Sequence, residues 1–151
     1  MLAAVLFSIG LIAPASAQNR IFEKYSDMDD VEYICITKSM FKMLSAKDGA
    51  VNINGVNVKG VTDAIKVLVI VNSTDKKVCK QMEEDYRAIK ADSAYEMLMM
   101  TKDNFSKSCT LYKDTQPDTE LVMYIAESGS QTFVVITGAL NREMINSLMA
   151  K

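Results

Sequence analysis

The chain has 151 residues, of which 49% are hydrophobic and 24% charged, with 17 Lys+Arg against 19 Asp+Glu and a formal net charge of −2. This composition is typical of one globular domain and argues against disorder, and the charge offers no positive field for nucleic acid. The absence of histidine excludes Ser/His/Asp and Cys/His nucleophilic enzymes and metal sites with histidine ligands.

The first segment, Met1–Ala17, has the pattern of a signal peptide. A short apolar run is broken at Pro14 and ends in Ala15-Ser16-Ala17, the small-x-small pattern that precedes cleavage. No Lys or Arg precedes the run, which leaves open whether Met1 is the true start. We expect residues 18–151 to be exported, to the periplasm or outside the cell, as a single domain. Since a membrane-spanning helix needs about 20 apolar residues, we expect no stable membrane insertion after cleavage.

The next part of the chain predicts short helices and strands in turn. A helix following Asn19 ends at the acidic turn 27–30, and the alternation of Val31–Lys38 favours a strand. Helical spacing returns over Met40–Leu44, and the Asn54-Gly55 pair predicts a small hairpin or a tight loop within Val51–Val58.

Two longer elements follow. Ile65–Val71 is apolar at nearly every position, which predicts a central strand covered on both faces. Ser73-Thr74-Asp75 then caps a helix that runs to about Lys90. Its apolar face consists of Val78, Cys79, Met82, Tyr86 and Ile89.

The last third changes to the period of two that is typical of strands. Short turns separate four expected strands, Tyr95–Thr101, Ser108–Lys113, Glu120–Glu127 and Thr132–Gly138. Asn141 then caps a final helix, with Leu140 placed to contact Ile145. The sequence therefore predicts a two-layer α+β fold, with a mainly antiparallel sheet, a C-terminal four-strand meander and helices packed on one face.

Three segments resemble a known family. They are Phe22–Leu44, Ile65–Ser73 and Phe133–Met149. Their order and motifs resemble the exported proteins of Bacteroidetes-type bacteria that are grouped as domain of unknown function 4252. The resemblance implies an envelope location and an α+β fold. It also implies that no catalytic residue is carried over, because no activity is established for the relatives.

Methionine is abundant, with 11 residues in the chain. Thioether sulfurs suit Cu(I), so the methionines at helical or strand spacing are candidate copper ligands. These candidates are Met40, Met43, Met97, Met99 and Met100. The favoured interpretation is that most of them pack in the core, where methionine fills irregular gaps.

Two further motifs have a structural and a chemical interpretation. Ser39-Met40-Phe41-Lys42 matches the S-x-x-K spacing of penicillin-interacting enzymes, as does Ser73-Thr74-Asp75-Lys76, but the companion motifs are missing and helix capping is favoured. Four carboxylates, Asp27, Asp29, Asp30 and Glu32, could attract Ca²⁺, although Glu32 stands where an EF-hand loop needs glycine. A polar turn is favoured there.

The three cysteines, Cys35, Cys79 and Cys109, match no zinc or redox template. One disulfide with a free thiol is an alternative to three buried thiols, and the latter is favoured.

We expect a non-catalytic exported module without a cofactor, which recognises an envelope protein or a small ligand through the sheet face or the region Asp48–Gly60 and is compatible with envelope sensing. Copper(I) binding is the alternative, and a Ser-Lys acyl enzyme acting through Ser39 is a third.

Overall fold

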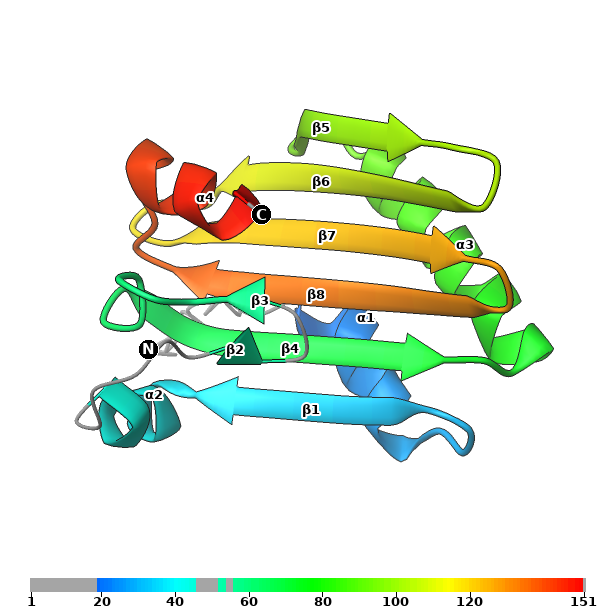
Figure 1. Ribbon diagram of the computed structural model, residues 1–151, viewed down its shortest axis with the longest axis horizontal. Coiled ribbons are helices and arrows are strands. Elements are labelled where there is room, and N and C mark those ends of the chain that lie inside the picture. Colours follow the sequence, from blue (N-terminus) through cyan, green and yellow to red (C-terminus); the bar gives the residue numbers. More distant parts are fainter. Residues whose placement is uncertain (1–18, 46–51, 54–55, 151) are drawn as a thin grey trace, which may run out of the picture.

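The computed structural model describes residues 19–45, 52–53 and 56–150. It contains a six-stranded antiparallel sheet in the order β1-β4-β8-β7-β6-β5 and a two-stranded hairpin, β2-β3 (Figure 1). The strands are β1 (Glu32–Thr37), β2 (Asn52–Ile53), β3 (Val56–Asn57), β4 (Ile65–Ser73), β5 (Glu96–Lys102), β6 (Ser106–Asp114), β7 (Thr119–Glu127) and β8 (Ser130–Gly138). The helical elements are α1 (Asn19–Glu23), the 3-10 turn η1 (Lys24–Asp27), α2 (Lys38–Ser45), α3 (Lys76–Ala91) and α4 (Arg142–Met149). The proposed signal peptide lies outside the described residues.

The α+β class and the C-terminal meander are confirmed. Strands β5 to β8 lie side by side in chain order, and each pair is antiparallel. The predicted central strand is β4, which pairs with β1 on one side and β8 on the other. The expected hairpin is present as β2 and β3, although its turn, residues 54–55, lies outside the described part.

The helices cover both faces of the sheet, which corrects the expectation that they cover one face. Helices α1 and α3 lie behind the sheet in Figure 1, whereas α2, α4 and the β2-β3 hairpin lie in front of it. The reason is that β4, β7 and β8 bury apolar side chains on both of their faces, in two separate core clusters. Each face therefore needs its own cover to exclude water.

On the first face, which we call the α3 face, α3 packs its apolar side against the middle of the sheet. The helix begins where the Asp75 carboxylate accepts hydrogen bonds from the backbone N–H of Lys77 and Val78. Its buried residues are those predicted from the 3.6-residue period, apart from the half-buried Cys79: Val78, Met82, Tyr86 and Ile89. They share one cluster with residues of η1 and of the strands, among them Tyr25, Tyr124 and Phe133.

On the second face, which we call the α4 face, short elements make the cover. Asn141 caps α4 by accepting a hydrogen bond from the Met144 N–H, as predicted, and Leu140 and Ile145 are buried in the same cluster. At the end of β8 the backbone of Gly138 lies against the turn that precedes β4, so close that a Cβ on residue 138 would overlap the Ala64 carbonyl oxygen. Glycine is therefore required there.

Candidate functional site

The outer edge of the meander is formed by β5, and it carries four of the eight exposed large hydrophobic side chains of the described residues. Among the described strands, β5 pairs only with β6, so one side of its backbone has no neighbouring strand. Four consecutive side chains are partly exposed to solvent: Met97 (39%), Leu98 (38%), Met99 (41%) and Met100 (44%). Edge strands of soluble proteins are ordinarily protected by charge, proline, a β-bulge or a covering loop, so four consecutive apolar side chains at such an edge are unusual.

A β-bulge determines where these four side chains point. The pairing with β6 shifts between Met97 and Met99, so Leu98 is the additional residue. Directly paired residues of antiparallel strands share a face. Met97 and Met100 pair with Leu111 and Cys109, which belong to the α3-face core, so both methionines lie on the α3 face.

Met99 pairs with Thr110, the residue between Cys109 and Leu111, and therefore lies on the opposite, α4 face. Leu98 also lines a cavity on that face. The bulge thus divides the apolar side chains of β5 evenly between the two faces of the sheet.

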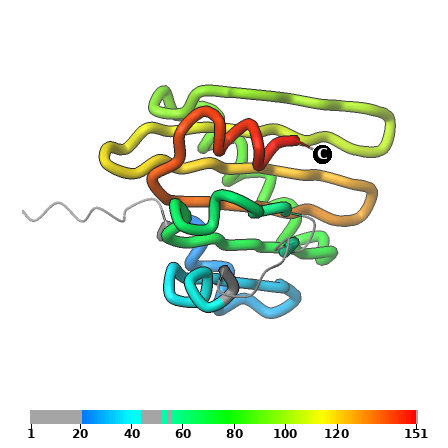
Figure 2. The backbone as a smooth tube through the Cα atoms, turned by 60° about the vertical axis from the view of Figure 1, so that its left-hand side comes forward, coloured from blue at the N-terminus to red at the C-terminus, as the bar shows by residue number. Residues whose placement is uncertain are grey.

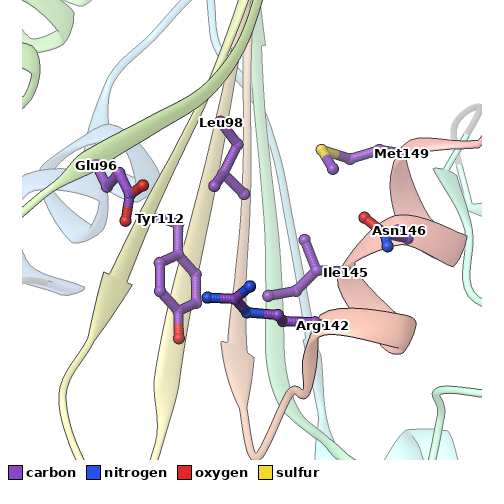
Figure 3. Close-up of a pocket in the computed structure, with 7 residues that line it drawn as sticks. All are labelled: Glu96, Leu98, Tyr112, Arg142, Ile145, Asn146 and Met149. Atoms are coloured by element: carbon purple, nitrogen blue, oxygen red, sulfur yellow. The ribbon is translucent and has the colours of Figure 1, made fainter.

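The cavity on the α4 face has a volume of about 380 Å³ and lies between α4 and the two outer strands β5 and β6. Figure 3 shows the strand side chains on one side, the α4 side chains on the other, and the Arg142 guanidinium reaching toward the Tyr112 ring. The lining residues are Glu96, Leu98, Tyr112, Arg142, Ile145, Asn146 and Met149. Apolar and polar groups therefore face each other across a space large enough for several side chains of a bound chain.

The cavity carries one charge of each sign. Arg142 is the first residue of α4, and Glu96 is the first residue of β5. Within the described part of the chain, neither takes part in any of the three ion pairs, which join Lys24 to Asp85, Lys66 to Asp118 and Arg87 to Glu83. Both charges are therefore available to a bound group.

The beginning of β5 is held by a buried polar contact on the α3 face. The Tyr95 hydroxyl donates a hydrogen bond to the carboxylate of Glu120, a residue of β7 that is only 3% exposed. Burial raises the pKa of the Glu120 carboxyl, while the Tyr95 hydrogen bond and Lys113 oppose this shift. This hydrogen bond thus joins the start of the edge strand to β7, while the apolar middle of the strand remains exposed.

The five candidate copper ligands do not converge on one site. Met40 and Met43 lie on α2, beside β1, and β1 and β5 are the two opposite edges of the sheet (Figure 2). All five side chains are exposed, so the expectation that these methionines pack in the core is wrong. The fully buried Met82 does pack in the core.

The serine motifs have positions that suit structural roles. Ser39 and Lys42 are exposed on α2. Ser73 is buried, and its hydroxyl donates to the Asp30 carbonyl oxygen at 2.6 Å and accepts from the Asp75 N–H at 3.1 Å. These bonds join the turn before β1 to the start of α3, so the Ser73 hydroxyl has a structural role as a hydrogen-bonding group.

The acidic segment and the cysteines also have defined places. Asp29 and Asp30 form the turn before β1, where Asp30 has a φ of 61°. No group of three acidic or cysteine side chains in the described residues is close enough to hold a metal ion. All three cysteines are free thiols, but Cys35 is exposed and Cys79 is half-buried, which corrects the expectation that all three are buried.

The surfaces expected to bind a partner are also placed differently. Within the described residues, β4, β7 and β8 bury side chains on both faces of the sheet, whereas the side chains of the outer strand β5 are exposed. Residues 46–51 and 54–55 of the region Asp48–Gly60 lie outside the described part. Sequence reasoning missed that Arg142 and Leu98 line one cavity, because they lie far apart in the chain and are brought to the same cavity only by the fold.

Comparisons with known proteins give a family and no further relative. The model of a family described as Domain of unknown function (DUF4252) matches residues 25–148. No curated protein and no solved structure matches the chain. Within the described residues, no helix is both long and apolar enough to cross a membrane.

Proposed function

This chain belongs to the DUF4252 family, a domain of unknown function, and from that premise and the geometry we propose that it is an exported, non-catalytic recognition module. It binds an extended segment of a second protein, which adds to the sheet as a strand beside β5. The observation that supports this proposal is the edge of β5, where an unpaired backbone coincides with four exposed apolar side chains.

Strand addition uses the chemistry that an edge offers. The outward-facing N–H and C=O groups of β5 can form a ladder with an added strand, which supplies affinity without regard to sequence. Leu98 and Met99 on one face, and Met97 and Met100 on the other, then contact the side chains of the added strand. Because contacts alternate between faces, the bound segment should be apolar at neighbouring positions on both faces.

The cavity beside β5 gives the bound segment a direction. A side chain on the α4 face of the added strand can enter the space between α4 and the sheet. An acidic side chain there can pair with Arg142, and a basic one with Glu96, in a partly enclosed site where charge pairs are stronger than in open water. The occupant is therefore an apolar peptide segment with one acidic and one basic side chain.

Export is part of the proposal and rests on Met1–Ala17, with its apolar run and the Ala15-Ser16-Ala17 ending. N-terminal sequencing of protein recovered from the organism's envelope or medium should begin at Gln18. Recovery of the chain from the cytoplasm with Met1 intact would contradict export and leave strand addition to be judged by its own test.

The binding test uses random peptides displayed on phage and selected on the purified protein. We expect the selected peptides to be apolar at adjacent positions and to carry one acidic and one basic residue. Methylation of their backbone amides should weaken binding at least about tenfold, the effect of losing roughly 1.4 kcal/mol of hydrogen bonding. Leu98→Lys should remove binding, and Arg142→Glu should remove the preference for the acidic residue.

A matched control is available on the opposite edge of the sheet. Met43 is 68% exposed on α2, so Met43→Lys adds the same charge to an apolar surface remote from β5. It should leave peptide binding unchanged. The proposal fails if no peptide is selected, if N-methylated peptides bind equally well, or if the two lysine variants behave alike.

A further inference from the structure

The α3 face of β5 and β6 carries three sulfur-bearing residues at neighbouring positions. Met100 is paired directly with Cys109 across the two strands, and Met97 pairs with Leu111, the next residue on the same face of β6. Directly opposed residues have Cβ atoms about 5 Å apart, and long side chains also reach the diagonal position. The β-bulge is essential to this arrangement, because it places Met97 and Met100 on one face and Met99 on the other.

We propose that Met97, Met100 and Cys109 form a copper(I) site. Thioethers and a thiolate are soft ligands, and this set suits Cu(I) better than zinc, calcium or magnesium, which take harder or different donors. The site would use three sulfur ligands and no histidine. The proposal goes beyond the peptide-binding function and concerns the other face of the same strand.

The burial of the three residues agrees with such a site. Cys109 is 1% exposed, whereas the two methionines are partly exposed at the sheet edge. The metal would enter between the methionine side chains, which have three rotatable bonds and adapt their position. The Cys109 thiol loses its proton to solvent, and the resulting thiolate neutralises the single charge of Cu(I). A neutral complex avoids the high cost of placing an unpaired charge in the core.

A buried hydroxyl next to Cys109 provides an independent observation. Tyr86 is 2% exposed, and within the described chain its hydroxyl is the one buried side-chain polar atom without a well-formed hydrogen bond. The group that this hydroxyl meets is the Cys109 thiol, which is a weak hydrogen-bonding partner. A neutral thiol is a weak acceptor, but a copper-bound thiolate accepts hydrogen bonds well. Metal binding would therefore replace a weak partner of the Tyr86 hydroxyl with a strong one.

The experiment is a competitive titration of the purified protein with Cu(I), under reducing and anaerobic conditions, against the chelator bathocuproine disulfonate. We expect one Cu(I) per chain with a dissociation constant well below about 1 μM. The double variant Met97→Leu/Met100→Leu should bind at least about 100-fold more weakly, a larger effect than changes to groups around the ligands produce. X-ray absorption of the loaded protein should show sulfur ligands only.

Matched variants separate this site from general methionine binding. Met99→Leu changes the neighbouring thioether on the opposite face and should leave the affinity unchanged. Tyr86→Phe should weaken binding by about tenfold, the size of an outer hydrogen bond to a ligand. Since Cys109→Ala could disturb the core, its folding is checked by circular dichroism, and the methionine variants, all at exposed positions, decide the question independently.

Several outcomes would overturn the proposal. They are binding weaker than about 1 μM, equal affinity of the wild type and the double variant, and a loss in Met99→Leu as large as that in the double variant. Peptide binding in Leu98→Lys and copper binding in the double variant are separate readouts, so either proposal can fail alone.

Discussion

Removing the hydroxyl of Tyr86 should stabilise the protein, although the residue is part of the main core. Its ring stacks on Tyr124 with centroids 4.1 Å apart, and Phe retains this contact. The hydroxyl makes no well-formed hydrogen bond among the described residues and meets only the Cys109 thiol, and an unsatisfied buried polar group costs about 1–3 kcal/mol. Since the Cys109 thiol offers weak compensation, we expect Tyr86→Phe to raise the free energy of unfolding by about 1 kcal/mol.

The comparison that makes this test decisive is Tyr25→Phe. The Tyr25 hydroxyl is also in the core region but donates to the Asp85 carboxylate at 2.5 Å. Losing a hydrogen bond to a charged group should lower the free energy of unfolding by about 1.5–3 kcal/mol. Urea unfolding followed by circular dichroism measures both variants without added copper, and a thermal midpoint about 3–5 °C higher should accompany Tyr86→Phe. If Tyr86→Phe destabilises the protein as Tyr25→Phe does, the hydroxyl has a strong partner and the reasoning is wrong.

Three further predictions concern stability. Because the pKa of Glu120 is raised above its ordinary value of 4.5, the folded state holds that proton more tightly than the unfolded state. Relative to Glu120→Gln, the wild type should therefore gain stability as the pH falls from about 7 toward 4.5, and equal pH profiles in urea unfolding would refute this. Gly138→Ala should cost roughly 1–3 kcal/mol, because the new methyl group meets the Ala64 backbone, and an unchanged thermal midpoint would refute that overlap. Met82→Ala should cost about 2–5 kcal/mol in urea unfolding and the exposed Met99→Ala about 0.5 or less, whereas similar losses would contradict the burial difference.

The elements of the fold could be predicted because local patterns determine them. The Asp75 and Asn141 caps, the continuous apolar run of β4 and the turns of the meander are each encoded within a few residues. The cover on both faces was also implied by β4, whose apolar side chains alternate between two clusters. The expectation of helices on one face did not use that information.

The candidate site could not be predicted in the same way. A strand that is apolar at four successive positions has the pattern of a buried strand, and only the strand order shows that β5 is an edge. The bulge at Leu98 reverses the face of every residue before it relative to strict alternation. A pattern of period two therefore places Met97 and Met100 on opposite faces, whereas they share one face in the structure. The cavity depends on the packing of α4 against strands that lie much earlier in the chain.

The pairing of β4 with β8 has a consequence for the order of folding. Consecutive strands of the meander are joined by short turns, so their pairing closes small loops, whereas Asn72 and Thr132, which are bonded across the β4–β8 pair, lie 60 positions apart. We expect β5 to β8 to assemble early and the β1–β4 pair to dock afterwards, as the slower, long-range step. The exposed edge of β5 would then be present from an early stage of folding. A partly folded chain would already expose this edge before β1 and β4 have paired with the meander.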